Sequence, residues 1–378
     1  MLEFYLFLIS IILLLFYLHF LAGILKGLNK LSYSTSTKLI DEFVSIIIPF
    51  RNESKNILTS LKSIENQNYP KEKFEVIYVN DNSEDDSLNK LICAKKSGNV
   101  KVISVPNEFL SNAHKKRAIS FGIENSQGEI IVTTDADCQH GPNWLKSLME
   151  NFDDETGFVS GPVEFNEDHS LFSKLQKLEF AGLVFTGAGL IGNNTPIICN
   201  AANLTYRKSL FDQVNGFKDH LNLSSGDDEM LMQKIWKETN YKIKFCLNKE
   251  AIVLTDANDT IERFYNQRKR WASKGLFYAD KLLIFKLLLI FLFYLSFVLL
   301  PVAAVILSIH YLYLFIFNLM MKIVFESRIM KKGTQLLYGK SLLKYLIISE
   351  VFQIPYIVIA GVSGLFGNYK WKNRKIKR

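Results

Sequence analysis

Apolar residues are distributed unevenly along the chain, in three long blocks that flank a middle region of short alternating runs. Residues 4–25 carry no charge and are long enough to cross a bilayer as a single helix. A second block, residues 282–321, is interrupted only by Lys286, and a third, residues 345–367, contains one acid, Glu350. The pattern predicts a membrane protein with a large water-exposed insert.

The first apolar block is predicted to be an uncleaved anchor over residues 1–30. No basic segment precedes it, and its apolar run is longer than that of a typical signal peptide. Three lysines follow it closely, at positions 26, 30 and 38. Basic residues concentrate on the cytoplasmic side of membrane helices, so the domain at residues 40–280 is expected in the cytoplasm.

The C-terminal blocks are expected to contain several membrane-embedded segments. Residues 282–321 are too long for one span and fit two helices with a break near Pro301, followed by a cytoplasmic linker at residues 322–344. A full span at residues 345–367 would place the basic tail, residues 368–378, outside the cell. We therefore expect this third segment to be re-entrant or interfacial, with a bend near Pro355 and Gly361.

Strand and helix patterns alternate through the first half of the middle region. Near-continuous apolar runs alternating with amphipathic segments indicate a parallel sheet covered on both faces. Ligands of such sheets bind outside the carboxyl ends of the strands. The predicted strands are 44–50, 74–81, 100–106 and 129–137, and the predicted helices are 54–67, 87–96 and 114–126.

The second half of this region is predicted from weaker patterns. Residues 168–192 are amphipathic at first and then apolar and glycine-rich, and residues 196–217 suggest a short pair of strands leading into a helix. Residues 225–239 begin a helix with acids in its first turn. Residues 259–275 form a basic, aromatic helix that leads directly into the second apolar block.

Charge and cysteine content narrow the possible partners. The formal net charge is +8, and part of it is concentrated in the tail. Such a tail favours attraction to anionic lipid over nucleic-acid binding, because it has no folded partner surface. The four cysteines form no CxxC pair, which gives no zinc or redox signature and suits a reducing compartment.

Two acids, Asp135 and Asp137, end the fourth predicted strand one residue apart. Divalent cations such as Mg²⁺ take oxygen ligands and often bridge a carboxylate to substrate phosphates. By itself the Asp-x-Asp pattern is equally consistent with a solvated turn. Asp81 and Asp228 would converge on the same sheet edge.

Six motifs occur in the order found in one enzyme family. They are VSIIIPFRNE, YVNDNSEDDS, KKRAISFGI followed by GEIIVTTDADC, CNAANLTYRK, GDDEML and QRKRW, and they cover residues 44–271. Together they resemble the family 2 glycosyltransferases of the GT-A fold, in particular the membrane-integrated synthases of cellulose, chitin, hyaluronan and poly-N-acetylglucosamine. The resemblance implies an α/β domain with a mainly parallel central sheet plus transmembrane helices.

The resemblance also implies roles for individual residues of the donor site. A uridine pocket would be lined by Pro49, Arg51, Glu53 and Asp81, with Lys115 near the nucleotide. Asp135 would position the ribose or the donor sugar, and Asp137 would bind Mg²⁺ or Mn²⁺ on the diphosphate.

Roles on the acceptor side follow from the last two motifs. Asp228 matches the general base of the family's Thr-Glu-Asp motif, but the chain reads Gly226-Asp227-Asp228, so Asp227 or Glu229 remains an alternative base. Acids in a first helical turn are also common caps. Gln267, Arg270 and Trp271 match Gln-x-x-Arg-Trp, which contacts the donor diphosphate and the acceptor sugar. A juxtamembrane basic–aromatic belt is the structural alternative.

The expected activity is therefore inverting transfer from a UDP-sugar to a growing polysaccharide or lipid-linked glycan at the plasma membrane. A non-processive enzyme that adds one sugar to a lipid carrier is the alternative. A glycoside hydrolase also uses paired carboxylates, but it needs no nucleotide pocket. A transporter would explain the helices and not the soluble domain. The expected partners are the donor, the acceptor, membrane lipids and a partner subunit or second copy, without nucleic acid.

Overall fold

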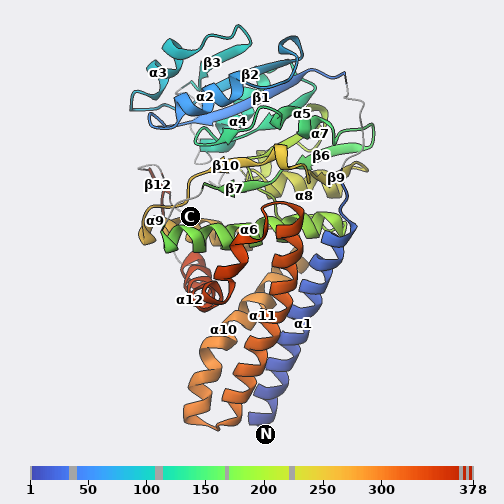
Figure 1. The fold of residues 1–378 in the computed structure, drawn as a ribbon, viewed down its shortest axis with the longest axis vertical. Helices are drawn as coiled ribbons and strands as arrows, with labels where there is room; N and C mark the ends of the chain where they lie inside the picture. The colour runs from blue at the N-terminus through green and yellow to red at the C-terminus, as the bar shows by residue number, and fades with distance from the viewer. Residues whose placement is uncertain are drawn as a thin grey trace.

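The computed structural model describes residues 2–33, 41–106, 114–166, 170–220, 226–365, 369–371 and 374–376. Three layers follow one another along the long axis (Figure 1). An α/β layer lies at one end, a platform of helices that run across the axis lies beneath it, and three long helices extend from the platform to the other end.

The central sheet has seven strands in the order β3-β2-β1-β4-β8-β6-β9. Strands β1 to β4 pair in parallel, β8 is antiparallel to both of its neighbours, and β6 and β9 pair in parallel. The mainly parallel sheet predicted from the sequence is confirmed. The strands are β1 (Val44–Phe50), β2 (Phe74–Asn80), β3 (Val100–Ser104), β4 (Ile130–Thr133), β6 (Thr156–Ser160), β8 (Leu204–Arg207) and β9 (Lys242–Phe245).

The register of the parallel strands brings their polar ends together. Phe50 pairs with Asn80, and Ile47 pairs with Thr133, so β1, β2 and β4 end at the same edge of the sheet. The backbone N–H of Asp81 continues the ladder by donating to the carbonyl of Phe50 at 2.9 Å. The predicted convergence of polar residues at this edge is therefore observed.

Amphipathic helices cover the sheet as their spacing predicts. Helix α2 buries Ile57, Leu61 and Ile64, which recur at the i, i+4, i+7 spacing of one helix face. Around the sheet lie α2 (Ile57–Glu65), α3 (Ser87–Ala94), α4 (His114–Glu124), α5 (Trp144–Met149), α7 (Lys208–Gln213) and α8 (Glu229–Glu238).

A small second sheet joins the α/β layer to the platform. Its strands, in the order β5-β10-β7, are β5 (Gln139–His140), β10 (Val253–Thr255) and β7 (Val163–Phe165). The buried amide of Asn203 connects the two sheets, because it accepts from Trp144 Nε1 at 3.0 Å and donates to the carbonyls of Pro162 and Ala251 at 2.8 Å.

The strand pair predicted within residues 196–217 is wrong. Only β8 forms, and the segment before it is irregular. In that segment the side chain of Asn200 accepts from the backbone N–H of Ala202 at 2.9 Å, a local turn that competes with ladder pairing.

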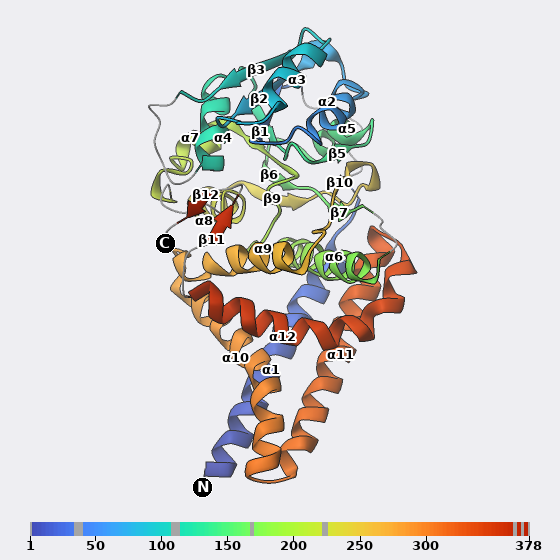
Figure 2. The same ribbon diagram turned by 90° about the vertical axis from the view of Figure 1, so that its left-hand side faces the viewer.

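The platform consists of α6 (Leu171–Gly192), α9 (Ile261–Ser273) and α12 (Leu346–Leu365), all of which lie across the long axis (Figure 2). Helix α12 continues through Pro355. Its transverse orientation is compatible with the interfacial placement predicted for residues 345–367, which stays a prediction. The basic tail falls largely outside the described residues, apart from the backbone of a β11–β12 pair (Tyr369–Trp371 and Arg374–Ile376).

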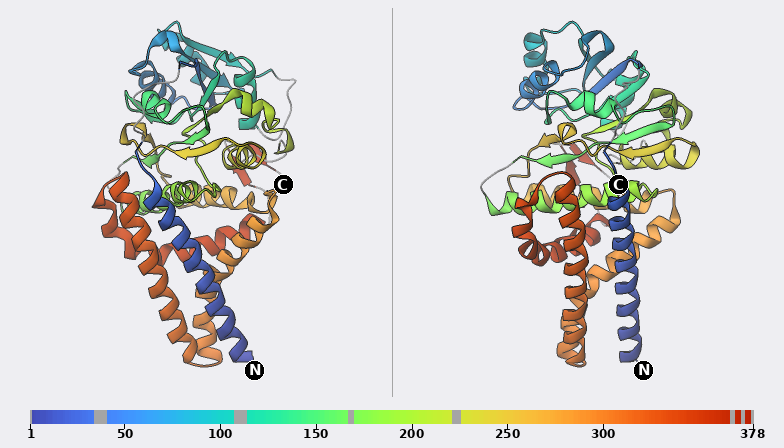
Figure 3. Two further views of the ribbon diagram at one scale, coloured as in Figure 1. Left: turned by 90° about the vertical axis from the view of Figure 1, so that its right-hand side faces the viewer. Right: turned by 45° about the vertical axis from the view of Figure 1, so that its right-hand side comes forward.

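Three long helices run side by side below the platform in every view (Figures 1 and 3), namely α1 (Leu2–Lys30), α10 (Lys281–Ile306) and α11 (His310–Leu336). By length and composition, the segments of the described chain that could cross a membrane are Glu3–Lys30, Lys281–Ile306 and Ser341–Gly364. Helix α10 continues through Pro301, so the predicted break lies later, between Ile306 and His310.

The segment at residues 322–344, predicted to be a cytoplasmic linker, is mostly helical, and its location stays a prediction. Helix α11 continues through it to Leu336, and a 3₁₀ helix follows at Lys340–Tyr345. Lys322 is fully buried and forms ion pairs with Glu326 at 3.0 Å and with Glu350 of α12. The charges that indicated the end of a membrane helix are thus satisfied inside the helix bundle.

Glycine allows α1 and α6 to cross with their backbones in contact. A Cβ at Gly27 would lie 1.7 Å from the carbonyl oxygen of Gly189, and a Cβ at Gly192 would lie 2.4 Å from that of Gly27. Only glycine fits at such a close approach. This seam of Gly27, Gly189 and Gly192 fixes the N-terminal helix against the platform.

Candidate active site

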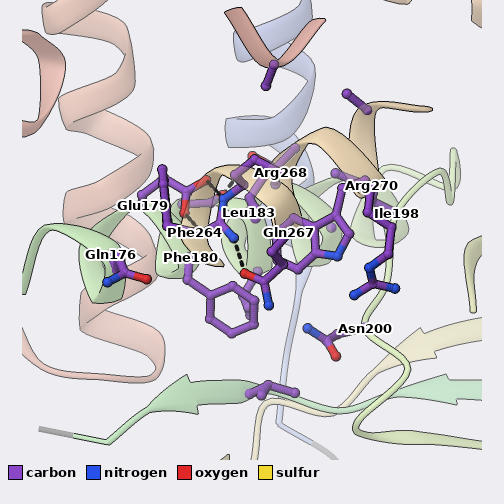
Figure 4. A pocket seen from close by; sticks show the side chains of 18 of the residues that line it. Gln176, Glu179, Phe180, Leu183, Ile198, Asn200, Phe264, Gln267, Arg268 and Arg270 are labelled. Carbon is purple, nitrogen blue, oxygen red and sulfur yellow. Dashed lines mark hydrogen bonds and ion pairs between the residues drawn. The ribbon is translucent and has the colours of Figure 1, made fainter. Parts of the chain in front are cut away.

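A cavity of about 1650 Å³ extends from the carboxyl edge of the sheet, past α6 and α9, to α10, α11 and α12. All eleven residues singled out from the sequence line it. They are Pro49, Arg51, Glu53, Asp81, Lys115, Asp135, Asp137, Asp228, Gln267, Arg270 and Trp271. Figure 4 shows the part of this cavity that lies against α6 and α9.

Asp81 and Arg51 form the end of the cavity beside β1 and β2. The carboxylate of Asp81 is buried and ion-paired with Arg117. The guanidinium of Arg51 donates to the carbonyl of Asp81 at 2.9 Å and pairs with Glu84 at 2.7 Å. Arg51 therefore holds the loop after β2, and Arg117 is a site residue that sequence reasoning missed. Its position two residues after Lys115, in the Lys-Lys-Arg motif, was the available signal.

Glu53 lies at the start of the segment that leads into α2. Its backbone N–H donates to Ser87 Oγ at 2.7 Å, and its carboxylate accepts from Asn56 Nδ2 at 3.2 Å. Pro49 lies within β1, opposite Val79 of β2. These contacts fix the walls of the pocket that the resemblance assigns to the nucleobase.

Lys115 joins the Asp-x-Asp pair to the acids before α8. Its ammonium lies 2.6 Å from Asp135 and 3.3 Å from Asp227. Burial alone would lower the pKa of Lys115, but these two carboxylates raise it well above its usual value. Burial would raise the pKa of Asp227, but the neighbouring lysines outweigh that effect and hold the pKa of this carboxyl below its usual value. Both groups are therefore charged at neutral pH.

Asp137 differs from its neighbours because it is exposed to the cavity. The described residues contain no group of three or more His, Cys, Asp or Glu side chains placed to enclose a metal. Two carboxylates, Asp135 and Asp137, offer a partial shell of hard oxygen ligands. That donor set fits Mg²⁺ or Mn²⁺ that completes its coordination with ligand phosphates and water, rather than a metal held by protein alone.

The three acids at the start of α8 have distinct environments. Asp228 caps the helix, because its carboxylate accepts from the N–H of Glu229 at 2.8 Å and from that of Ala201 at 3.2 Å. Glu229 is almost fully enclosed and is hydrogen-bonded by the hydroxyl of Tyr278. Asp227 points to Lys115. Asp228 is therefore the least enclosed of the three acids that line the cavity, and its ion pair, with Lys274 at 3.7 Å, is the longest.

Lys274 ties the acids of α8 to the end of α9. Its ammonium lies 3.0 Å from Glu229 and 3.7 Å from Asp228. Burial raises the pKa of Glu229, although Lys274 opposes that effect. Sequence reasoning missed this lysine, which lies three residues after Trp271 in a segment that its composition marks only as basic.

Helix α9 presents the Gln-x-x-Arg-Trp residues to the cavity (Figure 4). Trp271 is half-buried and packs near Phe180 of α6, with ring centroids 6.3 Å apart. Arg270 lines the cavity, and its guanidinium has no hydrogen-bond or ion-pair partner within the described part of the chain, so its N–H donors are available to a ligand.

The far end of the cavity reaches the long helices. Its lining there is mostly apolar and includes Leu288 and Phe352, whose side chains are exposed to solvent. A polar cluster of Tyr17, Tyr294 and Glu326 lies at the same end. One continuous space thus connects the acidic edge of the sheet with the apolar helices.

Comparison with known proteins identifies the family. The model of glycosyl transferase family 2 matches residues 45–214, and that of glycosyl transferase family group 2 matches residues 130–348. Glycosyltransferase AglE of Haloferax volcanii is 31% identical over 198 residues, which are 49% of this chain and 59% of that protein. Hyaluronan synthase of Streptococcus pyogenes is 26% identical over 261 residues, 65% of this chain and 60% of that protein.

Among solved structures, the mannosyltransferase PcManGT from Pyrobaculum calidifontis, in complex with GDP-Man and Mn²⁺, shares the fold. The TM-score is 0.58 at 17% identity, over 95% of this chain and 99% of that one. The chain spans about 60% of the length of the curated relatives it matches. With the second family model matched through both the α/β layer and the C-terminal helices, the chain belongs to glycosyl transferase family group 2.

Proposed function

We propose that the chain is an inverting glycosyltransferase that transfers the sugar of a nucleotide diphosphate sugar to a lipid-linked acceptor. The observation that carries this proposal is the single cavity that joins the acidic sheet edge to the apolar end between α10 and α12. A donor with a charged diphosphate suits the first end. An acceptor with a hydrophobic tail suits the second, because the tail loses contact with water there.

The donor is proposed to be a UDP-sugar, with the nucleobase beside Asp81 and Arg51. Asp137 and Asp135 would hold Mg²⁺ or Mn²⁺, which supplies neutralisation of the charge that develops on the leaving diphosphate. Arg270 supports that placement, because its unpaired guanidinium can form two parallel hydrogen bonds to phosphate oxygens. PcManGT binds a guanosine donor, so GDP-mannose is the alternative donor to be tested.

The proposed mechanism is a single displacement. Asp228 takes the proton of the acceptor hydroxyl as its oxygen attacks the anomeric carbon from the face opposite the diphosphate. One step from the opposite face inverts the configuration and gives a β-linkage from an α-linked donor. Hydrogen bonds from Ala201 and Glu229 orient the carboxylate of Asp228, and Trp271 offers an indole face to the acceptor sugar.

A growing polysaccharide is the second candidate acceptor. The Gln-x-x-Arg-Trp residues and the similarity to hyaluronan synthase favour it. In that case the cavity would hold several sugar units in succession, and the product would lengthen without release from the enzyme. The two acceptors differ in product size, which is directly measurable.

The test is a donor and acceptor screen with the full-length protein in detergent. Release of nucleotide is measured from UDP-Glc, UDP-GlcNAc, UDP-Gal, UDP-GlcA and GDP-Man, with and without a polyprenyl-linked sugar, whose hydroxyls can act as the acceptor, or a membrane lipid extract. We expect one UDP-sugar to be used, dependence on Mn²⁺ or Mg²⁺ that EDTA abolishes, and a lipid-soluble product carrying a β-linked sugar. Asp228→Asn is the inactive control. Lack of turnover with every donor contradicts the proposal, and water-soluble polymer supports the second acceptor.

A further inference from the structure

Arg268 lies at the centre of the Gln-x-x-Arg-Trp helix but occupies one of its unspecified positions. Only 4% of its side chain is exposed. Its guanidinium forms a two-pronged ion pair with Glu179 of α6, in which Nε lies 3.2 Å from Oε1. The hydroxyl of Tyr356, on α12, donates to the same carboxylate oxygen at 2.7 Å. One residue of α9 is thus connected to both other platform helices.

The guanidinium also determines the orientation of the Gln267 amide. Gln267 Oε1 accepts from Arg268 Nη1 and, at 3.0 Å, from Asn258 Nδ2 (Figure 4). Arginine is always a donor, so the amide oxygen must face it and the amide NH₂ must face away. Within the described part of the chain that NH₂ has no partner. Gln267 therefore presents donors to the cavity, which suit phosphate or sugar oxygens.

The same guanidinium packs against two aromatic residues of its own helix. Its central carbon lies 4.3 Å from the ring centroid of Trp271 and 4.4 Å from that of Phe264. A cation at this distance over a ring face is attracted by the ring quadrupole, most strongly for tryptophan. One face of the Trp271 indole is therefore held by Arg268.

We propose that Arg268 is a positioning residue that fixes the donor orientation of Gln267 and the plane of Trp271. Glu179 of α6 and Tyr356 of α12 hold Arg268 in place. The position of α12 is therefore transmitted to Gln267 and Trp271 through the side chains of Tyr356, Glu179 and Arg268. This inference rests on the proposed function for the roles of Gln267 and Trp271. Lysine cannot replace Arg268, because an ammonium has no planar fork for the carboxylate and no flat face to lay on an indole.

The kinetic test separates positioning from stability. Arg268→Met alone leaves Glu179 buried and unpaired, and we expect it to lower the Tm. The double variant Arg268→Met/Glu179→Met removes both charges and should regain the Tm while transfer stays at least about tenfold below wild type. Arg207→Met, which breaks an ion pair with Glu42 outside the cavity, is the control for stability loss without loss of transfer.

A double-mutant cycle identifies the residues through which Arg268 acts. Arg268→Met should reduce transfer strongly in the wild type and little in a Trp271→Ala background, since coupled residues are not additive. Arg268→Lys should keep the Tm closer to wild type and still lose transfer. Full recovery of transfer in the Met/Met double variant, or simple additivity with Trp271→Ala, overturns the proposal.

A second measurement needs no turnover. The full-length protein is labelled with fluorotryptophan, and the ¹⁹F resonance of Trp271, one of four tryptophans, is assigned by its loss in Trp271→Phe. Tyr356→Phe keeps the ring and removes only the hydroxyl that donates to Glu179, yet it should shift the Trp271 resonance and leave that of Trp144 in place. The shift should disappear in an Arg268→Met background.

An unmoved Trp271 resonance in Tyr356→Phe overturns the link to α12. If the wild type transfers no sugar at all, the proposed function fails, and the ¹⁹F measurement still decides the role of Arg268.

Discussion

The two neighbouring acids Asp227 and Asp228 give the sharpest test of the site, because the same isosteric change to asparagine is expected to affect transfer differently at each position. Asp228→Asn keeps one side-chain oxygen, which can accept from the N–H of Glu229 as Oδ1 does, but its NH₂ group replaces Oδ2, the acceptor from the N–H of Ala201. Asparagine caps helices about as well as aspartate. Lys274 keeps Glu229 at 3.0 Å as its nearer partner. Because the N–H of Ala201 loses its acceptor, we expect the free energy of unfolding to fall by about 1–3 kcal/mol.

The expected loss of transition-state stabilisation is larger than this loss of stability. An asparagine cannot take a proton, so transfer should fall by roughly 10²–10⁴-fold, which is about 3–5 kcal/mol of transition-state stabilisation. In Asp227→Asn, Lys115 retains Asp135 at 2.6 Å, so the loop before α8 should keep its place. We expect that variant to lose less than about tenfold, since no group that the mechanism uses is removed.

The assay combines titration calorimetry, initial rates and thermal unfolding on the same preparations. Both variants should bind UDP with Mn²⁺ as the wild type does, because neither acid contacts the metal in the proposed site. Near-normal transfer by Asp228→Asn together with a large loss in Asp227→Asn would refute the assignment and move the base by one residue. Loss of UDP binding in Asp228→Asn would instead indicate a damaged donor site.

Three other predictions follow from separate features. Trp271→Ala should reduce transfer strongly with little change in UDP affinity by calorimetry, and an equal loss of both would indicate a collapsed α9. Gly27→Val should prevent stable folding, measured by Tm and size-exclusion chromatography in detergent, because its Cβ would overlap the α6 backbone; Gly98→Ala, with no atom within 4 Å of the new Cβ, is the control. Burial lowers the pKa of Lys116 to about 8 from 10.5, so the unfolded chain binds more protons between these values and stability rises with pH there. Lys116→Met should raise the Tm most near pH 7, and the gain should shrink above about pH 8; a constant gain up to pH 11 would contradict this.

The sequence predicts the sheet edge well because two local signals agree there. Apolar runs identify the parallel strands, and the first polar residues after each run, such as Asp81 and Asp135, must lie at their ends. The sequence does not reveal the partners of these residues. Arg117 meets Asp81, and Arg268 meets Glu179, across 36 and 89 residues, and no local pattern encodes such pairings.

Charge was a poor guide to the end of helix α11 for a related reason. Lys322 and Glu326 mark, by hydropathy, the point where an apolar helix meets water. In the folded chain Lys322 forms ion pairs with both Glu326 and Glu350 inside the bundle, and the helix continues. Hydropathy treats each charge separately and does not register that two residues of α11 meet a third on α12.

The glycine seam between α1 and α6 means that the α/β layer and the platform do not form a unit that is independent of the N-terminal helix. Leu21, Ile24 and Leu28 of α1 are buried within the same hydrophobic core as the strands of the sheet. Truncation of the chain before residue 34 would uncover an apolar strip along α6, at a cost of about 1.5–3 kcal/mol for each large side chain that loses its partner. A shortened enzyme would therefore need detergent or a replacement helix, even though the segment removed is the one that a domain map labels as an anchor.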